Sequence, residues 1–483
     1  MDTVLLRIRI NPSAGRGPVK PVNGVGQPPM VGALGDWSML HYLQEAGIPY
    51  SRLHDVGGWL GGGLYVDIPN LFPDFDADET DPASYRFAYT DSLMDALVEN
   101  GVEPFFRLGV TIENFVERGF PPMRTLPPPD FAKWARICEH VIRHYTEGWA
   151  DGAHHKIAYW EIWNEPDNQP DEKCNPLWGG PFSEYIRLYG IAAPHLKAKF
   201  PHLKIGGYGS CGFYAGVGSD RVPAANSSPR MEYFVDCARE FLAAVRDNGW
   251  PMDFFTFHSY SPPEEAMRQV RFADELLNDH GFPADTCERI FNEWLPHVEL
   301  ANLGGAFQAS AVAAELIALQ HGPCALACIY DARCGVGNYS PLFNPLTQKP
   351  HKAYYAFVAF NELRKRGTAV KVDVAATDAA PSRHGVDNVH AAAARGPDGS
   401  LAVMLANTGD APVPFALDAV DAAEVDAAPS PRVSKIEAPD AAEVDATEPP
   451  AFLRVRIVDD TRTWEEVPLP AALPPHAILL AEA

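Results

Sequence analysis

Two glutamates lie at the ends of short apolar segments that are typical of β-strands. Glu165 follows the run 157–164 and precedes Pro166, and Glu293 follows the run 289–292. A carboxyl group beside an asparagine and large indoles is poorly suited to a core. It is well suited to acid/base and nucleophilic chemistry on a sugar, where two carboxyl groups flank one glycosidic bond. The pair therefore predicts glycosidic bond cleavage.

The elements that must position these glutamates repeat along residues 20–365. Four joints share one pattern, in which a helical stretch ends at glycine and proline then precedes a strand: Gly47, Gly101, Gly249 and Gly281 begin them. Glycine stops a helix in the left-handed conformation, and proline blocks its resumption. Eight strands are predicted, at 22–26, 50–55, 104–109, 157–165, 203–209, 253–260, 289–294 and 326–333.

This alternation predicts an α/β fold, a (β/α)8 TIM barrel spanning residues 16–365. A doubly wound open sheet is the structural alternative. After residue 366 short alternating strands separated by acidic, Ala/Pro-rich stretches predict an antiparallel β-sandwich over 366–483, and residues 1–15 have the same texture and are expected to join it.

The strand-end motifs resemble those of retaining glycoside hydrolases of the large (β/α)8 clan. Trp163-Asn164-Glu165-Pro166 matches the clan's acid/base motif on strand four, and Phe291-Asn292-Glu293-Trp294 matches the nucleophile motif on strand seven. Within the clan the chain looks most like family 39, the β-xylosidase and α-L-iduronidase family. Asn292 departs from the threonine expected before the nucleophile. Further similar segments are 52–55, 81–85 with Asp91, 161–166, 258–260 and 350–357.

The resemblance implies a retaining mechanism in which Glu293 attacks the anomeric carbon and Glu165 is the acid/base. A less polar setting is expected to raise the pKa of Glu165, and Pro166 is expected to hold this residue extended. By carry-over, Arg52 and Tyr260 are the donors that keep Glu293 ionised. Asn164 is expected to donate to the sugar 2-hydroxyl.

Other residues at the same rim have candidate roles as well. His54 and His258 either bind sugar hydroxyls, the favoured interpretation, or are structural. Trp163 and Trp294 are expected to floor or wall the pocket, and core packing is an equal alternative for Trp163. Arg333 either binds a sugar carboxylate, pairs with Asp331 or closes the barrel rim.

Glu161 shares strand parity with Glu165. We interpret it as a buried ion-pair partner of Arg107 rather than a catalytic group.

The formal charge of −24 argues against nucleic acid or an anionic membrane as a partner. The N-terminus has no signal-peptide pattern and no run reaches membrane-span length, so a cytoplasmic location is expected. Eight scattered cysteines favour free thiols, and neither a metal nor a cofactor is expected. The oligomeric state, a homo-oligomer included, is left open.

The sequence thus predicts a retaining exo-glycosidase acting on β-xyloside-, galactoside- or arabinoside-like bonds in a glycoside or oligosaccharide substrate. The alternatives are an endo-glycanase of the same clan and a non-catalytic carbohydrate-binding protein on this scaffold.

Overall fold

The computed structural model describes residues 5–29, 39–56, 66–113, 124–215, 228–335, 339–376, 388–419, 452 and 454–483. The chain divides into two compact units. The barrel unit comprises Pro21–Gly304 and Gly322–Tyr354. The sandwich unit comprises Met1–Lys20, Gly305–His321 and Tyr355–Ala483.

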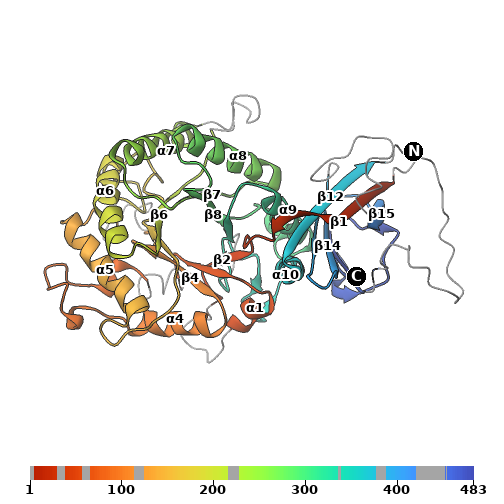
Figure 1. Ribbon diagram of the computed structural model, residues 1–483, viewed down its shortest axis with the longest axis horizontal. Helices are drawn as coiled ribbons and strands as arrows, with labels where there is room; N and C mark the ends of the chain where they lie inside the picture. Colours follow the sequence, from red (N-terminus) through yellow and green to blue (C-terminus); the bar gives the residue numbers. More distant parts are fainter. Residues whose placement is uncertain are drawn as a thin grey trace, which may run out of the picture. The chain divides into compact units, whose positions relative to one another are not determined.

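Eight parallel strands close into a barrel in sequence order, with the first paired to the last (Figure 1). They are β2 (Gly24–Gly26), β3 (Tyr50–Leu53), β4 (Glu103–Leu108), β5 (Tyr159–Ile162), β6 (Lys204–Ser210), β7 (Phe254–Ser259), β8 (Glu288–Trp294) and β9 (Leu326–Ile329). Each coincides with a predicted strand. The TIM barrel is confirmed, and the open-sheet alternative is excluded by closure between β2 and β9.

Helices follow the barrel strands along the chain (Figure 1). The helices are α1 (Leu40–Glu45), α3 (Ile68–Leu71), α4 (Ala88–Glu99), α5 (Phe131–Glu147), α6 (Phe182–Lys199), α7 (Pro229–Asn248), α8 (Pro263–Asp279), α9 (Ala306–His321) and α10 (Tyr354–Arg366), with 3-10 turns at Pro82–Ser84 and Leu300–Asn302. The side chain of Asp130 caps α5, and Ser228 caps α7. The four predicted joint glycines all have positive φ, between 58° and 86°, which is the left-handed conformation that ends a helix.

The barrel interior is apolar at one end and polar at the other. A cluster of buried residues fills the N-terminal halves of the strands: Phe105, Tyr159, Phe254, Ile290, Leu326 and Cys328. The C-terminal halves carry buried charged and polar side chains, among them Arg52, Arg107, Glu161, His258 and Glu293. The apolar layer closes the barrel beneath them, so these polar groups are directed to the rim where barrel enzymes bind ligands.

Nine strands form the sheet of the sandwich unit, in the order β17-β16-β19-β14-β13-β12-β1-β15-β18. They are β1 (Leu6–Pro18), β12 (Thr368–Ala376), β13 (Val389–Arg395), β14 (Leu401–Asn407), β15 (Val413–Ala419), β16 (Arg454–Val458), β17 (Thr463–Glu466), β18 (Ala472–Leu473) and β19 (Ala477–Glu482). The pairs are antiparallel except β1 with β15. Side chains from several strands of this sheet share one core, which includes Ile8 of β1, Val372 of β12, Leu405 of β14 and Leu479 of β19.

Two short strands, β10 (Phe343–Asn344) and β11 (Lys349–Pro350), pair in the barrel unit. Most of the acidic 418–448 stretch lies outside the described residues. No described helix is long and apolar enough to cross a membrane.

Candidate active site

The two glutamates meet at the C-terminal rim of the barrel. Glu293 lies within β8, and Glu165 follows β5 by three residues. One oxygen of each carboxyl group and a ring nitrogen of His258 all lie within 4.8 Å of one another. This spacing matches the roughly 5–5.5 Å at which one carboxyl group attacks while the other protonates, and it is shorter than the roughly 6.5–9.5 Å needed to place a water between them.

Glu165 is held in an uncommon backbone conformation. Its φ is 42°, in the left-handed region, so the expectation that Pro166 keeps it extended is wrong. The Glu165 amide donates to the Gly209 carbonyl at 2.9 Å, and its carbonyl accepts from the Asn168 amide at 3.1 Å. Non-glycine residues adopt this region at a cost of about 1–3 kcal/mol, so the turn that requires it must be fixed by its neighbours.

Donors on both sides stabilise the negative charge of Glu293. Arg52 donates to its Oε1 at 2.5 Å, and the Tyr260 hydroxyl donates to its Oε2 at 2.7 Å. These are the two donors that the resemblance implied. Burial opposes the charge on Arg52, but Glu161 and Glu293 outweigh burial and raise its pKa.

Arg52 also orients Asn164. A guanidinium nitrogen of Arg52 donates to Asn164 Oδ1, which leaves Nδ2 without a partner among the described residues. An amide whose oxygen is held in this way presents its donor end, as a bond to a sugar hydroxyl requires.

The surroundings of Glu165 differ from expectation. Burial by itself would raise its pKa, but the hydrogen bond and charge of His258 and a hydrogen bond from Asn168 outweigh burial, and the pKa is lowered. His258 Nδ1 lies 2.7 Å from Oε1, and Asn168 Nδ2 lies 2.7 Å from Oε2. The prediction of a raised pKa is therefore wrong, because sequence pattern did not reveal these two partners.

His258 contacts both glutamates. Its side chain is fully buried, and its Nδ1 lies between Glu165 and Glu293, 3.5 Å from the Oε2 of Glu293. The favoured prediction of sugar binding is wrong for this histidine, which contacts the two carboxyl groups instead.

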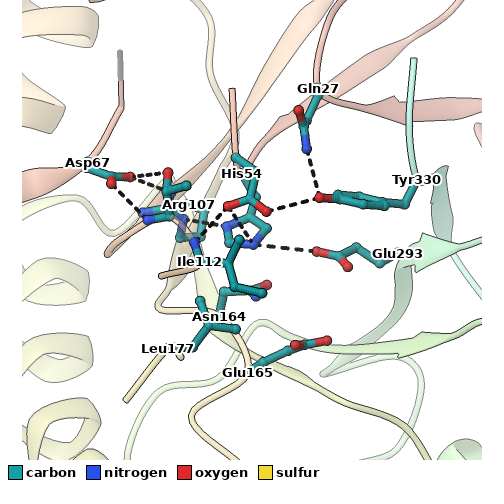
Figure 2. Close-up of polar contacts among 12 residues, drawn as sticks. Gln27, His54, Asp67, Arg107, Ile112, Asn164, Glu165, Leu177, Glu293 and Tyr330 are labelled. Atoms are coloured by element: carbon teal, nitrogen blue, oxygen red, sulfur yellow. Dashed lines mark hydrogen bonds and ion pairs between the residues drawn. The ribbon is translucent and has the colours of Figure 1, made fainter. Parts of the chain in front are cut away.

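A contact with Arg107, drawn in Figure 2, determines the tautomer of His54. Arg107 donates to its Nδ1 at 3.2 Å, so Nδ1 is the acceptor and the proton is on Nε2. That Nε2 lies 3.4 Å from Asp55 and 4.0 Å from Glu293. Burial and the charges of Arg107 and Arg52 lower the His54 pKa. His54 is thus a neutral donor beside the nucleophile candidate, consistent with hydroxyl binding.

A chain of hydrogen bonds continues from His54 across the rim (Figure 2). Gln27 donates to the Tyr330 hydroxyl at 2.9 Å, and Tyr330 donates to Asp55 at 3.0 Å. Burial raises the pKa of Asp55 to about 6. Sequence reasoning assigned no role to Gln27, Asp55 or Tyr330, although each lies at or just beyond the end of a barrel strand, which is the position that marks a rim residue.

Glu161 pairs with Arg52 rather than with Arg107. Its Oε2 lies 2.7 Å from Arg52, and its Oε1 accepts from Asn292 at 2.7 Å. Arg107 and Glu161 are register partners in β4 and β5. However, Asp67, from the segment after β3, binds Arg107 at 2.8 Å (Figure 2). The predicted pair is wrong because no pattern located Asp67.

The indoles are core residues. Trp294 has no exposed surface and Trp163 is 1% exposed, so neither presents a face on which a pyranose ring could stack. The pocket-wall prediction for Trp294 is wrong, and core packing holds for Trp163, whose ring lies against Trp134 and Trp178.

Arg333 lies 3.6 Å from Asp331. That is the pairing given as one alternative to carboxylate recognition.

Asp167 and Asn168 are further residues of the site that the sequence pattern did not identify. Asp167 is buried behind Glu165 and accepts from Tyr208 and Ser210. Burial and the charge of Glu165 raise its pKa to about 7. The run Asn164-Glu165-Pro166-Asp167-Asn168 was the available signal, since three further polar side chains surround the glutamate.

By donor type, Glu165, His258 and Glu293 could also hold a divalent cation. His258 Nδ1 and Glu165 Oε1 already share a hydrogen bond of 2.7 Å. The geometry therefore matches an acid/base pair beside a second carboxyl group.

Parts of the chain match known glycosyl hydrolases. Residues 369–434 match the model of the glycosyl hydrolase family 30 β sandwich domain. The chain is 25% identical over 252 residues to a β-xylosidase of Geobacillus stearothermophilus and 26% identical over 246 residues to one of Caldicellulosiruptor saccharolyticus. These alignments cover 46% and 47% of this chain and 44% and 41% of the relatives, so the chain matches less than half the length of each.

Solved structures share the whole fold. A glucosidase from Croceicoccus marinus aligns over 99% of this chain and 98% of its own, with a TM-score of 0.70 and 18% identity. A family 39 β-xylosidase from Caulobacter crescentus aligns over 99% of both chains, with a TM-score of 0.60 and 18% identity. The model of glycosyl hydrolases family 39 matches residues 31–299, more than half of the chain, and the protein therefore belongs to family 39 of the glycosyl hydrolases.

Proposed function

We propose that this glycosidase is a retaining exo-enzyme that removes terminal β-xylose- or related galactose- or arabinose-type residues by double displacement. The observation that carries the proposal is the close approach of the two carboxyl groups, within 4.8 Å, at the rim of the barrel. The two relatives named above are β-xylosidases, which favours a xyloside.

The first step follows from the contacts of each group. Glu293 attacks the anomeric carbon as the bond to the leaving oxygen breaks, and Glu165 gives that oxygen a proton. Tyr260 and Arg52 hold the Glu293 carboxylate oxygens in place for attack. Asn164 offers its free Nδ2 to the 2-hydroxyl, a bond that strengthens as the oxocarbenium-like state forms.

In the second step Glu165 takes a proton from water. The resulting hydroxide attacks the anomeric carbon, the bond to Glu293 breaks, and the carboxylate returns to its donors. The product keeps the configuration of the substrate because two inversions occur.

The neutral-sugar assignment rests on charge. Arg333 is engaged by Asp331, and Arg52 is engaged by Glu161 and Glu293. Such a rim disfavours a substrate carboxylate, so a uronide is a poorer match than a neutral pentoside or hexoside.

A panel of aryl glycosides tests the function, with the anomeric configuration of the first product followed by NMR. We expect fastest turnover of a β-xyloside, with the β-product formed first. An α-product from a β-substrate would contradict retention. Hydrolysis of polymeric xylan without turnover of aryl monosaccharides would favour the endo-acting alternative.

Two variants test the roles. Glu293→Ala is expected to lose several orders of magnitude in turnover on an activated aryl glycoside. Glu165→Ala is expected to lose much less on that substrate, because a good leaving group needs little protonation, and azide should restore its deglycosylation. Equal and mild losses in the two variants would remove the assignment.

A further inference from the structure

We propose that Glu165 does not act alone and that His258 holds the catalytic proton with it, so that the acid/base is a carboxyl–imidazole pair. This inference rests on the proposed role of Glu165. It makes His258 a positioning and proton-storing residue that never touches the sugar.

The backbone of β7 brings His258 close to both glutamates. The pairing of β7 with β8 shifts register between Phe257 and His258, so that His258 and Glu293 become register partners. The imidazole then lies between the glutamates, with Nδ1 2.7 Å from Glu165 and 3.5 Å from Glu293. A separation of 2.7 Å is that of a short, charge-assisted hydrogen bond, along which a proton can move without rearrangement of either side chain.

Charged groups surround the imidazole ring of His258. Glu165 and Glu293 face Nδ1, while Arg52 and the neutral His54 approach from β3. Glu161 is bound to Arg52. Three carboxylates against one guanidinium leave an excess of negative charge, so the site favours one added proton.

The surroundings of the other ring nitrogen, Nε2, differ from those of Nδ1. Nε2 is buried and has no hydrogen-bond partner among the described residues. An added Cβ at Gly209 would lie 3.3 Å from it. An imidazolium with one unpartnered N–H is less stable than one with two partners. That unpartnered N–H is the same in the imidazolium and in the neutral ring with its proton on Nε2, so the contacts of Nδ1 with Glu165 and Glu293 determine whether the second proton stays on the ring or moves to Glu165.

The proton balance over the cycle is simple. In the free enzyme Glu165 is a carboxylate and His258 carries protons on both nitrogens. During glycosylation the Nδ1 proton moves to Oε1, the O–H bond turns toward the glycosidic oxygen, and the proton leaves with the departing alcohol. His258 is then neutral with its proton on Nε2.

The second step restores the pair. The Nδ1 lone pair now faces the Glu165 carboxylate, an arrangement in which two acceptors repel each other. A proton taken from the attacking water removes this repulsion, so the pair is a stronger base at that point than a lone carboxylate. The proton returns to Nδ1 and the hydroxide goes to the anomeric carbon, so atoms and charges balance.

The test replaces His258 by asparagine, whose amide keeps a donor near Nδ1 but cannot store a proton. We expect His258→Asn to move the alkaline limb of the kcat/KM profile to lower pH by about one unit or more. Phenyl glycosides should lose activity much more than dinitrophenyl glycosides, and the solvent proton inventory should change from two protons to one. His155→Asn is the matched control, since His155 also bonds a carboxylate, Asp95, at 2.9 Å but lies in another part of the barrel unit.

A wild-type pH profile and proton inventory in His258→Asn would overturn the inference. If that variant fails to fold, ¹⁵N-histidine NMR of the wild-type protein decides instead. An imidazolium signal for His258 at pH 7, lost in Glu165→Gln, is expected, and a neutral ring at pH 7 would refute proton storage.

Two variants distinguish failure of the carboxyl–imidazole pair from failure of the proposed acid/base role of Glu165. If azide rescues Glu165→Ala while His258→Asn behaves as wild type, Glu165 is the acid/base and only the pair is refuted. If azide fails to rescue Glu165→Ala, the role of Glu165 itself fails.

Discussion

Replacement of Arg52 by leucine should destabilise the barrel far more than loss of an ordinary arginine. Arg52 is 1% exposed, and its guanidinium contacts Glu161 at 2.7 Å, Glu293 at 2.5 Å and the amide oxygen of Asn164. Removing one partner of a buried ion pair costs about 3–5 kcal/mol, because the remaining charge stays buried. Here two carboxylates are left, so we expect the upper part of that range.

The assay is the thermal unfolding midpoint, measured at pH 8 and at pH 5. At about 2 °C per kcal/mol, a loss of about 4–5 kcal/mol means that Arg52→Leu should lower the midpoint by roughly 8–10 °C at pH 8. Carboxylates without a partner take up protons more readily, so the deficit should shrink at pH 5. The double variant Arg52→Leu/Glu161→Gln should recover part of the loss, since one of the two stranded charges is gone.

Arg268→Leu is the control. Arg268 pairs with Glu264 and Glu265 on the surface of α8, with 29% of its side chain exposed. Exposed pairs contribute about 0–1 kcal/mol, so this variant should unfold within a degree or two of wild type. A similar small shift for Arg52→Leu, or a deficit independent of pH, would refute the claim that Arg52 neutralises buried carboxylates.

Three further predictions concern single groups at the rim. Tyr260→Phe removes the hydroxyl that donates to Glu293 at 2.7 Å. Because a hydrogen bond to a charged group contributes about 1.5–3 kcal/mol, deglycosylation should slow by about 10–100-fold. A pre-steady-state burst should then appear with a dinitrophenyl glycoside, and absence of the burst would argue against this donor. Asn164→Ala should lose about 10–100-fold in kcat/KM on an aryl glycoside but almost nothing on the 2-deoxy analogue, and equal losses on both would contradict the 2-hydroxyl contact. Burial and Glu165 raise the pKa of Asp167 to about 7, so this carboxyl group contributes stability that is present below pH 4 and is lost as pH rises through 7. A shift of this size corresponds to on the order of 4 kcal/mol. Asp167→Asn should therefore flatten the fall of the unfolding midpoint between pH 5 and pH 8, and an unchanged dependence of the midpoint on pH would exclude this group.

The barrel could be predicted because its signals are local. Helix stops at Gly47, Gly249 and Gly281, each followed within two residues by proline, mark the joints, and apolar runs between them mark the strands. These patterns depend on backbone conformation and on burial of one face, both of which neighbouring residues determine. Glu165 and Glu293 were identified in the same way, because parallel strands bring their C-terminal ends to one rim.

The partners of those glutamates depended on the tertiary structure. Arg52 was assigned to Glu293 by resemblance, but its second bond, to Glu161, and the capture of Arg107 by Asp67 join side chains separated by long stretches of chain. Sequence spacing gives the face of a strand on which a side chain lies, and it does not give the reach of a long side chain or the position of a loop.

The carboxyl groups of the site could be located from the sequence, whereas their protonation depends on the tertiary structure. The sequence alone determined that two carboxyl groups would share one rim of a closed barrel, since that follows from strand order and strand ends. Only the tertiary structure decided that His258 lies between them and lowers the pKa of Glu165, because a pKa depends on the charges, donors and burial that surround a group in space.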